Sequence, residues 1–80
     1  SSDFFTLIEV FADDRVGLLY RITKALFDFE LDIRIAKIAT KGDQVADVFY
    51  VRDLLGRKVE NEERLRQIVE TLEFNLQDNR

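Results

Sequence analysis

The spacing of hydrophobic positions changes several times along this chain, and each change marks the start of a predicted element. Residues 4–12 read FFTLIEVFA, a run rich in aromatic and β-branched residues that predicts a first strand. Over residues 16–29 the apolar positions recur every three or four residues, which is typical of an amphipathic helix. Residues 31–40 and 44–53 return to a strand-like pattern. The segment Lys41-Gly42-Asp43 between them predicts a tight turn, so these two strands should pair antiparallel.

A second helix is predicted after a short connection. Asn61 is placed to cap its first turn, and Glu62 and Glu63 would lie near the positive end of its dipole. Its apolar stripe consists of Leu65, Ile68, Val69 and Leu72. Residues 73–77 read EFNLQ and suit either a short final strand or the tail of this helix.

The order of these elements predicts an α+β fold. Strand, helix, strand, strand and helix, with a last strand that is short or missing, form a ferredoxin-like βαββαβ sandwich with two helices on one face of an antiparallel sheet. We expect one domain over residues 1–80, with a core from about residue 5 to residue 76. The alternation within residues 31–40 slips near Ala36, which predicts a β-bulge there.

The face of the sheet away from the helices should carry apolar residues. Phe5, Leu7 and Phe11 fall on one side of the first strand, and both sides of residues 44–53 are largely apolar. A lone domain rarely exposes a large apolar patch. We therefore expect a partner surface, either a second copy in a homodimer or a neighbouring domain of a longer protein. Alternatively, no partner covers this face, and the alternation of apolar and polar residues is blurred because edge strands tilt and helix ends reach around the sheet.

Composition excludes several functions. The chain has no cysteine and no histidine, so we expect no zinc site, no thiol nucleophile and no histidine-based acid–base catalysis. Its net charge of −4 argues against nucleic acid or an anionic membrane as a partner, because both need a basic surface. No apolar run approaches the length of about 20 residues that spans a bilayer. We expect a cytoplasmic domain without catalytic residues, metal or cofactor.

The segment DDRVGLLYR, residues 13–21, joins the first strand to the first helix. A strand that turns into a helix presents unpaired backbone N–H groups together with the positive end of the helix dipole, an arrangement that suits a carboxylate or a phosphate. The alternative is that Asp13 or Asp14 only caps the helix, while Gly17 relieves crowding in its first turn.

Several segments together resemble the ACT domain, a βαββαβ module that binds amino acids and regulates attached enzymes. They are Asp-Arg-Val-Gly-Leu-Leu-Tyr at residues 14–20, Leu-Asp-Ile at 31–33, Ala-Lys-Ile-Ala-Thr at 36–40, Asp-Val-Phe-Tyr-Val at 47–51 and Gly-Arg-Lys at 56–58. Within this family the resemblance is greatest to the ACT segments of nucleotidyltransferases that sense glutamine. It implies that this chain is a non-catalytic regulatory part of such an enzyme.

The resemblance also implies a set of binding residues. Backbone groups of the first strand–helix turn would hold the carboxylate of the effector, with glutamine as the expected amino acid, and Asp14 would meet its ammonium group. In a dimer the same pocket would be lined from the facing subunit by Asp32 and Ile33. The turn residues in this set are Asp14, Arg15, Val16, Gly17, Leu18 and Leu19. Val16 stands where the family usually has proline, which leaves one more N–H group to satisfy.

Three other functions are compatible with parts of this pattern. An ACT-like domain can serve only for docking or dimerisation and bind no ligand. An acylphosphatase has the same order of elements and would use Arg15 or Arg21 to bind phosphate, but it also needs an asparagine on the sheet, and residues 31–53 contain none. An RNA-binding sheet would stack bases on Phe49 and Tyr50, but adjacent strand residues point to opposite faces and the surrounding charge is acidic.

Overall fold

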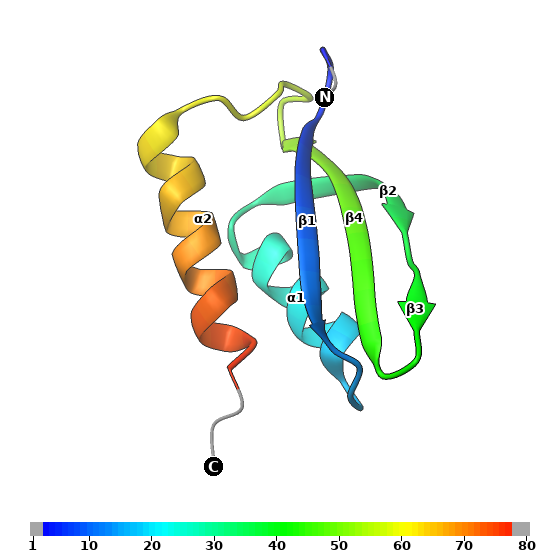
Figure 1. The fold of residues 1–80 in the computed structure, drawn as a ribbon. Helices are drawn as coiled ribbons and strands as arrows, with labels where there is room; N and C mark the ends of the chain where they lie inside the picture. Colours follow the sequence, from blue (N-terminus) through cyan, green and yellow to red (C-terminus); the bar gives the residue numbers. More distant parts are fainter. Residues whose placement is uncertain (1–2, 78–80) are drawn as a thin grey trace.

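The structure, a computed structural model, describes residues 3–77. Its elements are β1 (Thr6–Asp13), α1 (Leu18–Asp28), β2 (Leu31–Lys37), β3 (Thr40–Lys41), β4 (Gln44–Asp53) and α2 (Glu62–Asn75). The sheet is antiparallel, with β4 in the middle, β1 on one side, and β2 and the short β3 on the other (Figure 1). The helix α1 packs behind the sheet, and α2 stands beside β1 (Figure 1). The predicted α+β, ferredoxin-like arrangement is confirmed.

The core lies between the sheet and the helices. Alternate residues of β4, namely Val45, Phe49 and Val51, point toward the helices and are buried. The stripe of α1 fills the space above them with Leu18, Ile22, Ala25 and Leu26. From α2, by contrast, only Ile68 and Leu72 are buried. Thus α1 is embedded in the core, while α2 is attached mainly through its contact with α1.

The end of α2 decides between the two alternatives for residues 73–77. The helix continues to Asn75, and the Leu76 N–H group donates to the Leu72 carbonyl at 2.9 Å. Within the described residues no strand follows, so β1 has a paired neighbour only on the side of β4.

The predicted bulge exists but lies earlier in β2 than the sequence indicated. The register of β2 against β4 shifts between Ile33 and Ile35, just before Ala36. Because Ile33 pairs with Val51 whereas Ile35 pairs with Tyr50, the shift moves Ile35 to the face of the sheet away from the helices. In the sequence the bulge becomes visible only after its extra residue, where the alternation of apolar positions resumes on the opposite faces of the strand.

The face of the sheet away from the helices carries several apolar side chains, as expected. Phe11 on β1 is 74% exposed and Ile35 on β2 is 44% exposed. The rings of Phe5 and Tyr50 meet edge to face with centroids 6.1 Å apart, and the Lys37 ammonium lies 5.1 Å from the centre of the Tyr50 ring. A partner that covers this face remains a prediction.

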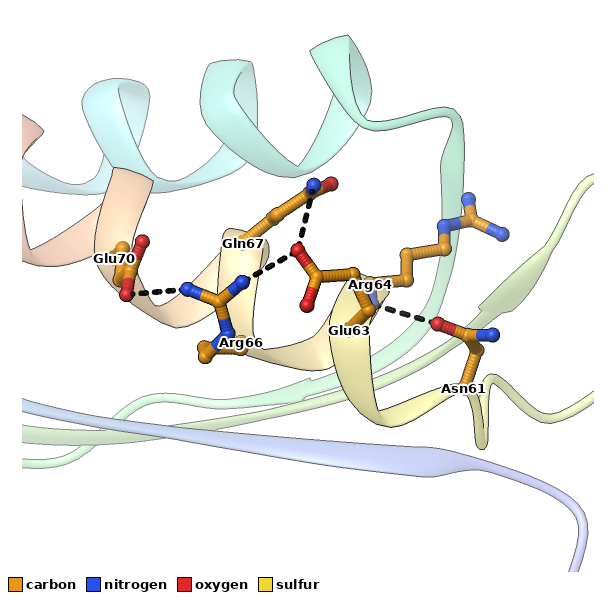
Figure 2. A network of polar contacts seen from close by, with 6 residues as sticks. All are labelled: Asn61, Glu63, Arg64, Arg66, Gln67 and Glu70. Atoms are coloured by element: carbon orange, nitrogen blue, oxygen red, sulfur yellow. Dashed lines mark hydrogen bonds and ion pairs between the residues drawn. The ribbon is translucent and has the colours of Figure 1, made fainter.

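Local hydrogen bonds fix the start of α2. The Asn61 side chain accepts from the Arg64 N–H group at 2.9 Å, so the predicted cap is confirmed, and both first-turn glutamates lie where the dipole favours them. Figure 2 shows the polar network that follows, in which the Arg66 guanidinium bridges Glu63 and Glu70. These two carboxylates raise the pKa of Arg66, with the hydrogen bond to Glu63 as the larger cause. Neither helix among residues 3–77 is long and apolar enough to cross a membrane.

Candidate functional site

The turn between β1 and α1 is held by backbone contacts. The Asp14 N–H group donates to the Asp43 carbonyl at 2.8 Å, which ties this turn to the one between β3 and β4. Gly17 is the N-cap of α1 and has φ 82° and ψ 3°, a left-handed conformation that disfavours a side chain. No side chain among residues 3–77 hydrogen-bonds to the first turn of the helix. The interpretation in which Asp13 or Asp14 caps the helix is therefore wrong, and α1 begins at Leu18.

The start of α1 leaves backbone donors free. The Leu18 N–H group donates to the Arg15 carbonyl at 3.1 Å, and the Arg21 N–H group donates to Gly17 at 3.0 Å. Between them, the N–H groups of Leu19 and Tyr20 have no protein partner among residues 3–77. The first turn also carries no acidic side chain, so the positive end of the helix dipole is uncompensated. This arrangement can receive a carboxylate.

The side chains of the predicted turn residues point in different directions. Val16 is fully exposed, Leu18 is buried in the core, and Leu19 is 46% exposed. The Arg15 guanidinium lies 3.6 Å from the Asp13 carboxylate. The turn therefore offers a ligand mainly backbone N–H groups, together with the exposed carboxylate of Asp14.

The other predicted residues, Asp32 and Ile33, lie beyond the far end of α1. They line a hollow of about 650 Å³ with Tyr20, Phe27 and Leu54, among others. The Asp32 carboxylate accepts from Arg52 Nε at 3.2 Å and lies 3.6 Å from the Arg34 guanidinium. The hollow extends along α1 to Tyr20 in the first turn, but since a helix rises about 1.5 Å per residue, the 11 residues of α1 place Asp32 and Ile33 roughly 16 Å from the turn. One chain does not bring the two parts of the predicted site together.

Lys24, on the exposed side of α1, also lines the hollow beside Asp32. It donates a hydrogen bond to the Asp28 carboxylate at 3.1 Å, and this bond, followed by the attraction between the two charges, raises the pKa of Lys24. The hollow thus carries a paired cation and a paired carboxylate, with apolar walls.

A groove that the sequence did not predict runs between β1 and α2, with a volume of about 700 Å³. Arg15 and Leu18 of the turn line one end of it. Asp13 and Gln44 lie at the same end, where the Gln44 amide donates to the Asp13 carboxylate. The antiparallel register of β1 and β4 places these two residues opposite each other, so the pairing of these two strands was the signal that could have predicted their contact. The α2 residues of the groove carry no comparable signal in the sequence.

The described residues contain no group of three or more histidine, cysteine, aspartate or glutamate side chains that could hold a metal ion. The fold, with a glycine-capped and uncompensated helix start after its first strand, is that of an ACT-type domain. The comparisons with known proteins give the particular family. The model of the ACR family N-terminal ACT domain matches residues 1–78, and the chain belongs to this family.

Several curated proteins with sequences similar to this chain are bifunctional uridylyltransferase/uridylyl-removing enzymes. The protein from Azospirillum brasilense is 49% identical over 78 residues, which cover 98% of this chain and 8% of that protein. The protein from Gluconobacter oxydans is 50% identical over 72 residues, which cover 90% of this chain and 8% of that protein. The chain thus spans about one twelfth of the length of these relatives.

A solved structure also has the same fold. The crystal structure of an unknown protein from Galdieria sulphuraria superposes with a TM-score of 0.66 and 18% sequence identity. The match covers 82% of this chain and 36% of that one. At this identity the likeness supports the fold alone.

Proposed function

We propose that this ACT domain binds an amino acid, glutamine, at the β1–α1 turn and thereby regulates a longer uridylyltransferase/uridylyl-removing enzyme in the cytoplasm. The observation that carries the proposal is the pair of free N–H groups of Leu19 and Tyr20 at an uncompensated helix start. Nucleotide transfer and hydrolysis would belong to other parts of that enzyme. Within this segment, the turn offers binding groups only.

The ligand has a defined orientation in this proposal. Its α-carboxylate accepts from the N–H groups of Leu19 and Tyr20, where the helix dipole favours negative charge. Its ammonium group lies near the exposed Asp14 carboxylate. Gly17 permits a close approach, because nothing lies within 4 Å of the position that a Cβ atom would take.

The second part of the site would come from a partner subunit or a neighbouring domain. Asp32 and Ile33 lie beyond the opposite end of α1 from the turn, and in this proposal they line the pocket of the turn from across an interface. Ligand binding would then favour one arrangement of the two domains. The coupling free energy expected for such an effector is about 1–3 kcal/mol.

A second candidate is a docking role without a ligand. The apolar side chains on the sheet face away from the helices favour it, since Phe11 and Ile35 there are exposed. In that case the turn would serve only to connect β1 to α1.

An amide NMR titration with glutamine tests the proposal, with glutamate and asparagine as comparison ligands. We expect saturable shifts at Leu19 and Tyr20 for glutamine only. Asp14→Asn should weaken this binding, whereas Asp43→Asn should not, because Asp43 contributes its backbone carbonyl to the turn. Absence of shifts up to tens of millimolar glutamine, with the domain folded and its association state known, would favour the docking role.

A further inference from the structure

We call the face of the sheet away from the helices the open face. Val45, Phe49 and Val51 of β4 point toward the helices and are buried, so the alternate residues of this strand point toward the open face. Among residues 3–77, Figure 1 shows α1 behind the sheet and no helix in front of β1 and β4. The exposed side chains of Phe11 and Ile35 lie on this face. Contiguous apolar surface of this kind is typical of an interaction site.

The strand pairing arranges the open face in rows that cross the sheet. One row is apolar from end to end, because Leu7 of β1 and Ile35 of β2 both pair with Tyr50. The Phe5 ring meets the Tyr50 ring edge to face and extends this apolar surface. On β4, Val48 lies next to Tyr50 on the same face. The centre of the open face is therefore apolar.

Two further rows carry opposite charges at their two ends. In each of them, a carboxylate on β1 and a lysine on β2 or β3 pair with the same residue of β4. The rows are Glu9–Val48–Lys37 and Asp13–Gln44–Lys41. Asp32, a carboxylate on the β2 side, is already paired with Arg52 and Arg34. The open face thus has an acidic β1 side and a basic side along β2 and β3.

This distribution of charge makes the open face complementary to itself in one orientation. A two-fold axis that runs along β4, between two copies, places the β1 side of each copy over the β2 side of the other. Every row then lies over the same row of the second copy with its ends exchanged. The contacts between copies are Leu7 with Ile35, Glu9 with Lys37 and Asp13 with Lys41. A two-fold axis across the strands would instead bring carboxylates to carboxylates and lysines to lysines.

We propose that the open face binds the open face of a second copy of this chain, with the two sheets stacked about 10 Å apart and their strands running in the same direction. The apolar residues of the two β4 strands form the centre of the contact. The carboxylate–lysine pairs form its rim on both sides. A nucleic acid would leave Glu9 and Asp13 without a partner, whereas a second copy supplies a lysine for each.

This contact differs from the interface that the proposed glutamine site would use. Because each row lies over itself, Asp32 of one copy stays near Arg52 of the other, at the end of β4 that is far from Gln44. The β1–α1 turn follows Asp13, which pairs with Gln44 at the opposite end. The stacked dimer therefore needs no ligand at the turn, and the two proposals can fail independently.

The size of the open face predicts a weak dimer. The eight residues of β1 extend over about 27 Å, and three strands about 4.8 Å apart make the face roughly 15 Å wide. This area is well below the roughly 800 Å² that each partner contributes to a standard stable interface. We expect a dissociation constant on the order of 0.1–1 mM.

The first test is an NMR dilution series of the whole chain, from millimolar to micromolar concentration, without glutamine. The amide shifts of Val48 and Tyr50 should change with concentration. A sample that mixes two isotope labels reports contacts between copies only, and it should show nuclear Overhauser effects between Leu7 of one copy and Ile35 of the other. The proposal is overturned if the millimolar sample shows neither effect, or if the contacts between copies lie along the outer edge of β2 instead.

Charge reversal tests the orientation of the two copies. Glu9→Lys and Lys37→Glu should each weaken the dimer roughly fivefold or more, because two pairs per dimer change from attraction to repulsion. A chain with both substitutions should dimerise about as well as the original chain, since each pair is restored with its signs exchanged.

Glu60→Lys is the matched control for Glu9→Lys, because it makes the same change of charge at an exposed position in the connection to α2. This variant should dimerise about as well as the original chain. Circular dichroism establishes that each variant is folded. If the single reversals on the sheet do not weaken the dimer, or if the double variant does not restore it, the stacked arrangement is wrong.

Discussion

Replacing Thr6 by valine should destabilise the domain far more than its small change in shape implies. The Thr6 hydroxyl donates to the Val59 carbonyl and accepts from the Val59 N–H group, both at 2.8 Å. Both residues are buried, with Thr6 at 8% and Val59 at 5% exposure. This one side chain thus joins the first residue of β1 to the connection that leads into α2.

The expected magnitude follows from the two backbone groups that lose their partner. Valine fills nearly the same volume but cannot hydrogen-bond, so the N–H and C=O groups of Val59 stay buried and unsatisfied. Each such group costs about 1–3 kcal/mol, so the free energy of unfolding should fall by roughly 2–6 kcal/mol. A domain of 80 residues has a total of about 4–12 kcal/mol. The substitution should therefore remove a large fraction of the stability.

Thr6→Ser is the matched control, because it keeps the hydroxyl and loses one methyl group, at a cost of about 1 kcal/mol. Urea unfolding followed by circular dichroism measures both variants. With a slope of about 1 kcal/mol per molar urea, the midpoint of the valine variant should fall by roughly 2 M or more, with the slope unchanged. If the valine variant is as stable as the serine variant, the hydroxyl does not hold the connection and the reasoning fails.

Three further variants test local features. Asn61→Ala should lower the free energy of unfolding by about 1 kcal/mol through loss of the α2 cap, and an unchanged urea midpoint would contradict this. Gly17→Ala should cost about 1–2 kcal/mol, because φ is 82° and no contact compensates, whereas Gly17→Asn should cost less in the same assay. Backbone hydrogen bonds, first from Arg57 and then from Leu55, lower the pKa of Asp53 below its ordinary 3.8. Their stabilisation is complete above that pH and is lost as the pH falls through the folded-state pKa, so the free energy of unfolding of Asp53→Asn, measured by urea titration at several pH values, should fall less on acidification than that of the original chain.

The sequence predicted the helices because their apolar stripes have a clear period, and it predicted the strands because their runs are rich in apolar, β-branched and aromatic residues. Both patterns reflect burial against one shared core. Element ends were less predictable because they depend on backbone conformation. Two acidic residues before a helix indicated a side-chain cap, but Gly17 in a left-handed conformation begins α1 instead.

The candidate site was predictable only in its local part. The turn residues are contiguous, so the sequence places them together. Asp32 and Ile33 lie at the other end of α1, and no spacing in a single chain specifies how a second domain meets the first. The groove beside β1 also escaped prediction, because it depends on where α2 lies relative to a strand from which it is distant in sequence.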